Sequence, residues 1–306
     1  MATARSLSAG LSLIVLTSCG GTESPTESAP APMEAAPAAI ETTAPAASQL
    51  ELHKLDCGRI EISDLDVFST AGDYAGIADT FTNTCWLVRH PGGDLLWDLG
   101  LPGMLVNEGA MEQGIFTVSL DQTLADQVEA LGLSMTDIET VAISHSHFDH
   151  IGQVDQVKGS TWLVHQSEYD FMFPADNETP ADNAAQFAPF ADLDVAPFSG
   201  LHDVFGDGSV LIHETPGHTP GHTSLQVNLP GEGPIFLTGD LYHRTESREL
   251  RRVPQFNSDV QDSNGEPGAV TQASMAAFEA AVADVGGRVI IQHEPDDVDS
   301  LPAVLR

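Results

Sequence analysis

The chain has 306 residues, with 45 acidic and 11 basic side chains and a net charge of −34 at pH 7. This length suits one large α/β domain or two small ones. The shortage of Lys and Arg argues against nucleic acid as a partner, because phosphate contacts depend on cationic side chains.

Residues 1–19 resemble the signal peptide of a bacterial lipoprotein. Arg5 precedes a short apolar run over 7–16, and a membrane-spanning helix needs about 20 apolar residues. The small residues before Cys19 resemble a lipobox, in which the cysteine is lipidated and becomes the mature N-terminus; an ordinary cleaved signal is the alternative. We therefore expect a lipid-anchored protein of the cell envelope, on the periplasmic face or at the outer membrane, with its folded domain outside the cytoplasm.

Residues 20–50 are mostly Ala, Pro, Thr, Ser and Glu, without Lys or Arg. Such a segment cannot bury enough apolar surface to offset its ordering entropy, which predicts a disordered tether. The remaining residues, 51–306, are expected to form one domain.

Within that domain, alternating apolar residues predict strands, and helical spacing predicts two long helices. The strands are expected over 52–62, 84–88, 94–99, 140–144, 210–213, 224–229, 235–238 and 288–292. The helices are expected over 122–132 and 269–285, with a further helix–strand pair ending near His165. Residues 171–198, rich in Pro and Asp and carrying five phenylalanines, are expected to form a long loop. Their phenylalanines either line an acyl-tail pocket or anchor the loop.

Once the anchor has used Cys19, two cysteines remain, Cys57 and Cys85. Export to an oxidising compartment would permit a disulfide between them, and two buried free thiols are the alternative.

The strongest chemical signal is the run from Ser144 to His150, which holds His145, His147 and Asp149 as well. Three histidines and an aspartate just past a strand can converge on one point. Imidazole and carboxylate suit zinc and other borderline divalent metals.

This run resembles the HxHxDH signature of the metallo-β-lactamase superfamily, whose fold is an α/β sandwich of type αβ/βα, with two mixed sheets flanked by helices. Later ligands of that superfamily match TPGH ending at His218, LTGD ending at Asp240 and IQH ending at His293. The resemblance implies one metal on His145, His147 and His218 and a second on Asp149, His150 and His293, with Asp240 bridging them. Asp149 is also expected to act in catalysis.

The implied cofactors are two divalent ions, with zinc favoured and Mn, Fe or Co as alternatives. Two such ions can share a water and lower its pKa from roughly 15.7 towards about 7, which produces a bridging hydroxide. A bridging carboxylate is typical of the esterase, lactonase and phosphoesterase branches of the superfamily.

Runs such as LLWD over 95–98 and TPGHTPGH over 215–222 also resemble the N-acyl-homoserine lactonase family. This implies a small-molecule lactone substrate, opened by the hydroxide, and a role in quorum quenching. The alternatives are another ester, a phosphotriester or a β-lactam as substrate, or a metal-binding lipoprotein without turnover.

One position departs from that family, which places a tyrosine three residues after the bridging aspartate. Here Tyr242 comes two residues after Asp240 and His243 three, so either could supply a hydrogen-bond donor. His222 is expected to be structural. Asp98 either orients a ligand histidine or only ends a strand. His165, His202 and His213 are not expected to be ligands.

Overall fold

The computed structural model describes residues 49–175, 181–261 and 265–306. The predicted signal peptide and nearly all of the predicted tether lie outside these residues. Within the described ranges, no helix has both the length and the apolar character to cross a membrane.

Two β-sheets form the frame. The first has nine strands in the order β4-β5-β1-β2-β3-β6-β7-β8, with β14 paired to β1, and the second has five in the order β13-β12-β11-β10-β9. The first-sheet strands are β1 (Glu51–Ile62), β2 (Asp79–His90), β3 (Gly93–Trp97), β4 (Met111–Gln113), β5 (Phe116–Ser119), β6 (Thr140–Ala142), β7 (Thr161–His165), β8 (Asp194–Phe198) and β14 (Val304–Leu305). The second-sheet strands are β9 (His202–Asp203), β10 (Val210–Glu214), β11 (Thr223–Leu229), β12 (Gly233–Leu237) and β13 (Arg288–Ile290).

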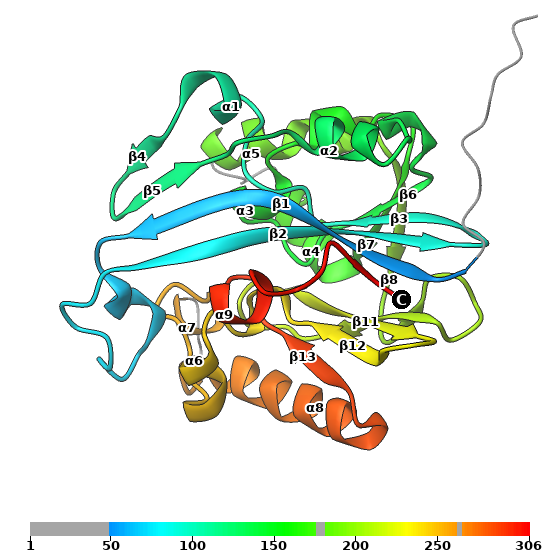
Figure 1. Ribbon diagram of the computed structural model, residues 1–306. Helices are drawn as coiled ribbons and strands as arrows, with labels where there is room; N and C mark the ends of the chain where they lie inside the picture. The colour runs from blue at the N-terminus through cyan, green and yellow to red at the C-terminus, as the bar shows by residue number, and fades with distance from the viewer. Residues whose placement is uncertain (1–48, 176–180, 262–264) are drawn as a thin grey trace, which may run out of the picture. The chain divides into compact units, whose positions relative to one another are not determined.

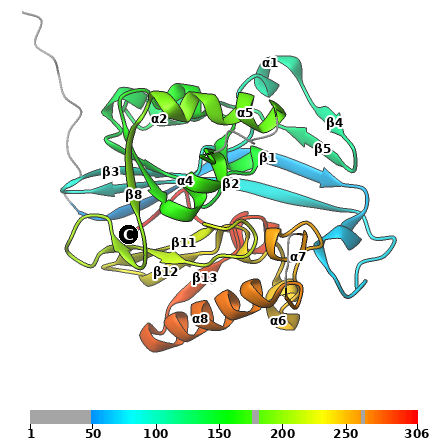
Figure 2. The same ribbon diagram turned by 180° about the vertical axis from the view of Figure 1, so that it is seen from behind.

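Helices cover the outer faces of both sheets (Figures 1 and 2). The α-helices are α1 (Leu105–Glu108), α2 (Leu124–Ala130), α3 (Phe148–Ile151), α4 (Gln166–Met172), α5 (Ala181–Phe187), α6 (Thr245–Leu250), α7 (Ser258–Gln261), α8 (Ala269–Val285) and α9 (Pro295–Val298). The 3-10 helices are η1 (Leu65–Phe68), η2 (Met135–Asp137), η3 (Val154–Gln156), η4 (Ala188–Asp192) and η5 (Gly239–Leu241).

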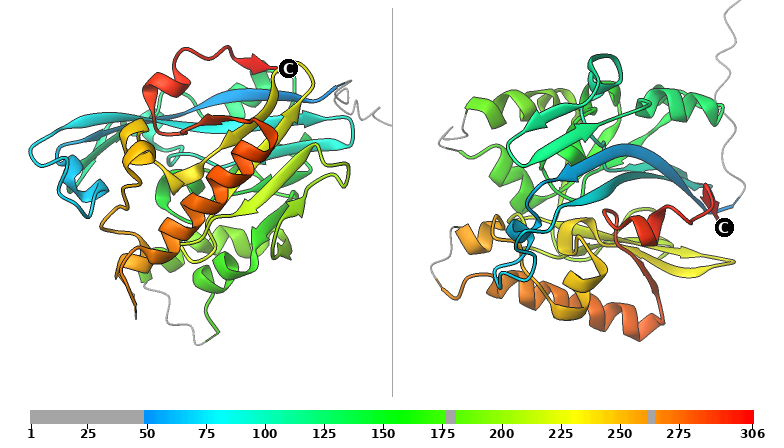
Figure 3. Two further views of the ribbon diagram at one scale, coloured as in Figure 1. Left: turned by 90° about the horizontal axis from the view of Figure 1, so that it is seen from below. Right: turned by 60° about the vertical axis from the view of Figure 1, so that its left-hand side comes forward.

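Strand alternation explains the layers. In β2, Trp86 and Val88 face the second sheet and pack with residues such as Leu225, whereas Cys85 and Leu87 face α2 and its neighbours. On the far side, Phe236 of β12 packs against α8, which runs along that face in Figure 3. The sequence pattern therefore produces two sheets facing each other with helices outside, and the predicted αβ/βα sandwich is confirmed.

The expectation of a long loop over residues 171–198 is wrong. The described part of this segment contains α5, η4 and β8. Its prolines misled the sequence interpretation, because Pro189 lies in the first turn of η4 and Pro197 lies in β8 at the edge of the sheet, where a missing N–H is tolerated. The β4–β5 hairpin, which the sequence analysis did not predict, extends the opposite edge.

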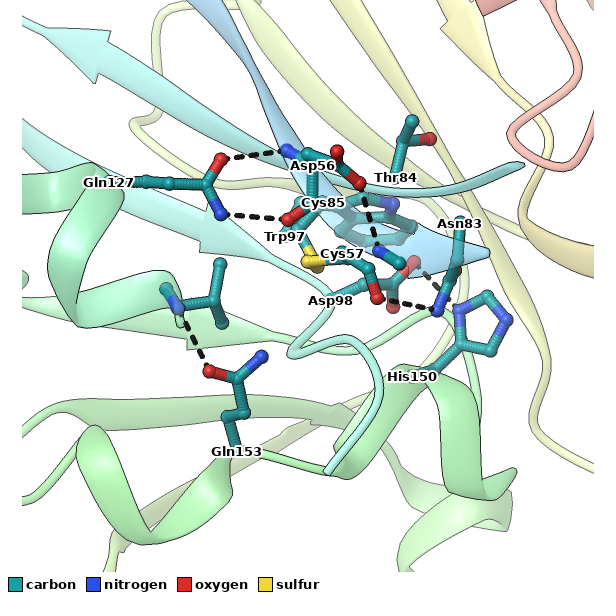
Figure 4. Close-up of a disulfide and its surroundings, with 12 residues drawn as sticks. Asp56, Cys57, Asn83, Thr84, Cys85, Trp97, Asp98, Gln127, His150 and Gln153 are labelled. Atoms are coloured by element: carbon teal, nitrogen blue, oxygen red, sulfur yellow. Dashed lines mark hydrogen bonds and ion pairs between the residues drawn. A yellow bond between two sulfur atoms is a disulfide. The ribbon is translucent and has the colours of Figure 1, made fainter. Parts of the chain in front are cut away.

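Cys57 of β1 and Cys85 of β2 form a disulfide with a Cα–Cα distance of 5.7 Å, which decides between the two alternatives (Figure 4). The register of β1 against β2 shifts between Asp56 and Gly58, where Gly58 has φ 117°. A Cβ at Gly100 would lie 2.6 Å from the Cys57 sulfur, so the loop that follows β3 can pass this close only with glycine there.

Candidate metal centre

The histidine run lies where β6 ends. Asp98, just after β3, donates its backbone N–H to Ala142 O of β6, and its carboxylate accepts the N–H of Ser144 at 2.6 Å. His147 then precedes α3, whose first turn carries Asp149 and His150. The local chain therefore turns sharply enough to direct four side chains towards one volume.

Two groups of side chains meet there. His145, His147, His218 and Asp240 form one group, and Asp149, His150 and His293 form the other, each with potential ligand atoms within 4.8 Å of one another. All seven residues proposed from the sequence are thus brought together. They come from the ends of strands in both sheets, so the centre lies at the junction of the two halves of the sandwich.

Asp240 lies between the two groups. Its Oδ1 is 3.1 Å from His150 Nε2 and 2.9 Å from His293 Nε2. Its Oδ2 is 3.2 Å from His218 Nε2 and 3.7 Å from His145 Nε2. One carboxylate oxygen thus faces each group, as a bridging ligand requires.

The outward hydrogen bonds of the histidines set which nitrogen faces inward. His293 Nδ1 donates to the carbonyl of Thr82 at 2.9 Å, and His150 Nδ1 donates to Asp98 at 3.0 Å. With Nδ1 protonated in a neutral ring, Nε2 carries the lone pair, and these two inward nitrogens lie 3.3 Å apart. Lone pairs facing each other at this distance repel unless a cation lies near both, so the donors fit a metal ion.

The group of His145, His147 and His218 also has ring nitrogens that face one another at short distances. His218 Nδ1 hydrogen-bonds to Asn257 Oδ1 at 2.8 Å, which leaves its Nε2 facing inward, 3.1 Å from His145 Nε2 and 2.9 Å from His147 Nδ1. Burial, with neighbouring histidines, holds the pKa values of His145 and His147 well below the usual range. Neutral imidazole is the form that binds a metal.

The second group favours positive charge. Burial lowers the pKa of His150 and of His293, but the nearby carboxylates, Asp240 and Asp149 for both and Asp98 for His150, together outweigh it and leave both pKa values raised. Burial would raise the pKa of Asp240, yet His293 and His150 hold it well below its usual range. The ionised carboxylate and its neighbours therefore attract a cation, whether a proton or a divalent ion.

A pocket of about 420 Å³ opens above the centre. Its floor includes His147, Asp149, Asp240, His243 and His293. Its walls are mostly apolar: Ile60, Val67, Phe68, Phe81, Ile115, Phe116, Phe148 and Phe256. No residue of 171–198 that the structure describes lines this pocket; instead Phe190 packs on Trp162 with ring centroids 4.4 Å apart. The expectation that this segment lines an acyl-tail pocket is wrong, and the anchoring alternative holds.

The family model described as "Metallo-beta-lactamase superfamily" matches residues 78–293, which hold all seven clustered residues. The chain belongs to this superfamily.

Relatives within the superfamily point to one branch. N-acyl homoserine lactonase AttM of Rhizobium radiobacter is 28% identical over 221 residues, which cover 69% of this chain and 81% of the relative. An N-acyl homoserine lactonase of a Bacillus species is 27% identical over 175 residues, 54% of this chain and 66% of the relative.

Solved structures agree on the fold. An N-acyl homoserine lactone hydrolase with N-hexanoyl-L-homoserine bound at its catalytic metal centre matches with a TM-score of 0.68 at 21% identity, covering 82% of this chain and 96% of that one. The dizinc quorum-quenching lactonase AidC matches with a TM-score of 0.61 at 19% identity, covering 83% and 89%.

The structure separates Tyr242 and His243, the two hydrogen-bond donors proposed beside Asp240. His243 Nε2 lies 3.0 Å from Asp240 Oδ2, and burial lowers the pKa of His243 to about 4 against the opposing effect of that carboxylate. The Tyr242 hydroxyl instead donates to Glu279 of α8 and its ring packs on Phe278. The suggestion that Tyr242 acts at the centre is therefore wrong, because its side chain points into the α8 packing layer.

The structure also places the remaining histidines and Asp98. His222 accepts the backbone N–H of Asp240 at 2.9 Å and contacts Thr215 O at 3.0 Å, which confirms a structural role. The Asp98 carboxylate contacts His150 Nδ1, so of its two alternatives the one in which it orients a ligand histidine is confirmed. His165, His202 and His213 belong to neither group of clustered side chains.

Glu168 of α4 is a supporting residue that the sequence analysis missed. Its buried carboxylate accepts the N–H and hydroxyl of Ser146 at 2.8 and 2.6 Å, the hydroxyl of Thr219 at 2.7 Å and the N–H of Gly221 at 3.0 Å. It thereby ties the loop of His145 and His147 to the loop of His218. A lone glutamate in a helix gives no sequence signal for this role.

Proposed function

We propose that this chain hydrolyses lactones and that N-acyl homoserine lactones are its substrate class. The observation that carries the proposal is the position of Asp240, with one carboxylate oxygen towards each histidine group, directly below an apolar pocket. The lactonase relatives support the choice of substrate within the superfamily.

The proposed ligands are His145, His147 and His218 for one ion and Asp149, His150 and His293 for the other, with Asp240 shared. Zinc is the proposed metal, since buried imidazole and carboxylate donors suit it; Mn, Fe and Co are the alternatives. When bound, such a pair supplies an activated water and polarises the ester carbonyl.

The chain's own residues position the substrate. The phenylalanine-rich walls exclude water and offer an apolar surface to an acyl chain, while the polar floor leaves room for a compact ring. His243 lies on that floor beside Asp240, where its imidazole can hydrogen-bond to the oxygen that leaves when the ring opens.

Ring opening tests this proposal. The metal-loaded full chain, the chelated chain and Asp240→Ala would be compared by pH-stat titration on acylated homoserine lactones, simple esters, phosphotriesters and β-lactams. We expect metal-dependent acid release from the lactones and its loss in Asp240→Ala. Faster turnover of another substrate class by the loaded chain would replace the lactone assignment, and metal binding without any hydrolysis would support a non-catalytic role.

We also propose that the chain is lipid-anchored through Cys19 in the cell envelope, on the basis of the sequence pattern alone. Wild type should partition with membranes, whereas Cys19→Ala should not carry the lipid. Equal membrane partitioning of both would contradict the anchor.

A further inference from the structure

A glutamine that precedes the last histidine of the centre uses the whole hydrogen-bonding capacity of its side chain. Gln292 is fully buried. Its Oε1 accepts from Trp97 Nε1 at 3.2 Å and from the backbone N–H of Gly239 at 3.0 Å. Its Nε2 donates to Thr84 O at 3.1 Å and to Asp98 Oδ2 at 2.9 Å. A primary amide has two donors and two acceptor sites on these atoms, so none is left over.

The partners allow only one orientation of this amide. The indole of Trp97 and the N–H of Gly239 can only donate, and the carbonyl of Thr84 can only accept. A flipped amide would place donor against donor and acceptor against acceptor. The side chain is therefore fixed in a single position by β2, β3 and the first residue of η5.

These contacts lead mainly to the second histidine group. They reach the first group only through Asp240, which lies between the groups, and through Asp98, whose other oxygen accepts the N–H of Ser144 beside His145. Asp98 accepts an N–H of the Gln292 amide. It also accepts the Nδ1–H of His150, and Figure 4 shows these two side chains together. Gly239 immediately precedes Asp240, and Gln292 itself immediately precedes His293. Gln292 thus contacts Asp98, which orients His150, and joins the segment of Asp240 to that of His293.

The other group has separate supports. His218 is held by Asn257, and the loops of His145, His147 and His218 are tied by Glu168. None of the five hydrogen bonds described for Gln292 reaches those residues: four involve its amide, and the fifth brings the Thr84 hydroxyl to its backbone carbonyl at 3.1 Å.

We propose that Gln292 is a positioning residue that preorganises the metal position formed by Asp149, His150 and His293 more strongly than the His145–His147–His218 position, which has Glu168 and Asn257 as further supports. The inference rests on the proposed metal-dependent function. A buried network that is fully satisfied holds its members rigidly, and loss of such an outer partner typically weakens metal binding by about 10- to 100-fold.

Titration of the metal-free full chain with Co²⁺, followed by visible absorption, measures each equivalent separately. Wild type is expected to bind two equivalents. Gln292→Met keeps the side-chain length and removes the four amide hydrogen bonds, and it should weaken one equivalent by about 10- to 100-fold while the other is weakened much less. Gln292→Glu keeps Oε1 for Trp97 and Gly239 but sets an oxygen against Asp98, and it should weaken the same equivalent.

Gln153→Met provides the matched control, because Gln153 is equally buried but bonds to Leu124 and Gln156 rather than to the ligand segments. It should bind both equivalents normally. Circular dichroism and the unfolding midpoint of each metal-free variant show whether it is folded, and if Gln292→Met does not fold, Gln292→Glu decides. Normal binding of both equivalents by a folded Gln292 variant, or equal weakening of both, would overturn the inference. A wild type that binds no metal would instead refute the proposed function.

Discussion

The carboxylate of Asp98 lies 3.0 Å from Nδ1 of His150, and Asp98 holds this position with a backbone φ of 63°. Few residues other than glycine adopt such a φ, although Asp and Asn tolerate it better than others. The left-handed turn after β3 is thus what aims the carboxylate at the imidazole. A backbone conformation of this kind persists only where its surroundings impose it.

Asp98→Asn separates charge from geometry at this position. Asn tolerates the same φ and has nearly the same shape, but its NH2 group must face either the Ser144 N–H or the N–H donors of Gln292 and His150. The free energy of unfolding of the metal-free chain should therefore fall by about 1 to 3 kcal/mol, the cost of an unsatisfied buried donor. Metal affinity at the His150 position should fall by about 10- to 100-fold, because the imidazole loses an anionic partner. Metal-competition titration measures this, with Asp203→Asn at the end of β9 as the control, and unaltered affinity would show that Asp98 is only a turn residue.

Metal removal should destabilise the folded chain. The inward nitrogens of His150 and His293 lie 3.3 Å apart, and those of His218 and His145 lie 3.1 Å apart, so the metal-free chain crowds buried imidazoles together without the ions that would bind them. A ligand that binds only the native state at about 1,000 times its dissociation constant adds roughly 4 kcal/mol. Urea unfolding with zinc and with chelator measures the difference, and coincident curves would argue against a metal centre.

His243→Phe should reduce kcat for lactones by about 100-fold or more, because it removes the hydrogen-bonding imidazole beside Asp240 while keeping an aromatic ring against Phe68 and Phe81. Metal content should be checked in the same samples. His213→Phe, which removes a histidine bonded to Gln226, should leave kcat unchanged. If kcat is retained in His243→Phe at full metal content, this histidine takes no part in the reaction.

The Cys57–Cys85 disulfide should contribute about 2 to 4 kcal/mol to the free energy of unfolding, since it closes a loop between residues 28 positions apart. The double variant Cys57→Ala with Cys85→Ala should unfold at lower urea concentration than wild type, and reductant should not affect it further. Wild type and double variant with equal stability under oxidising conditions would contradict this prediction.

Glu279 should make stability depend on pH. Its bidentate pair with Arg248, at 2.8 and 2.9 Å, lowers the pKa of Glu279 despite partial burial. A carboxyl group with a depressed folded-state pKa stabilises the protein above its unfolded pKa of about 4.3, and this stabilisation is lost as pH falls through the folded value. Glu279→Gln should therefore cost about 1 kcal/mol at pH 7, a small value because both groups are partly exposed.

The difference between Glu279→Gln and wild type should shrink as the pH is lowered below about 4. Paired urea unfolding curves from pH 7 to pH 3 provide the measurement. A difference that stays constant over this range would show that the ion pair does not contribute.

The metal centre could be predicted from the sequence because its ligands lie either close together in the chain or at the ends of short recognisable motifs. Four ligands lie within six residues after a strand, and the other three each end a short recognisable run. The strands of the sandwich also carry clear alternation, and α8 has the bounds expected for it, since it begins after Gly268 and ends at Gly286 in a left-handed C-cap.

The supports and the pocket could not be predicted in the same way. Glu168, Gln292 and the phenylalanines of the pocket walls acquire their roles only when separate segments pack together. The phenylalanines of 171–198 form a cluster in the sequence, but the fold separates them: Phe173 and Phe190 pack on Trp162, Phe198 packs on His165 and His202, and Phe171 is exposed. A sequence shows which side chains are present, whereas the side of a sheet they face depends on pairings far along the chain.

The twelve-residue strand β1 runs from the chain ends of the folded body to the pocket. Leu52 near its start pairs with Leu305 at the C-terminus, whereas Ile60 near its end lines the pocket. At about 3.3 Å per residue, these positions lie roughly 25 Å apart. Both chain ends of the folded body are therefore remote from the pocket mouth, so the protein can be immobilised on a bead or fused to a carrier at either end without obstructing diffusion of small molecules to its histidines.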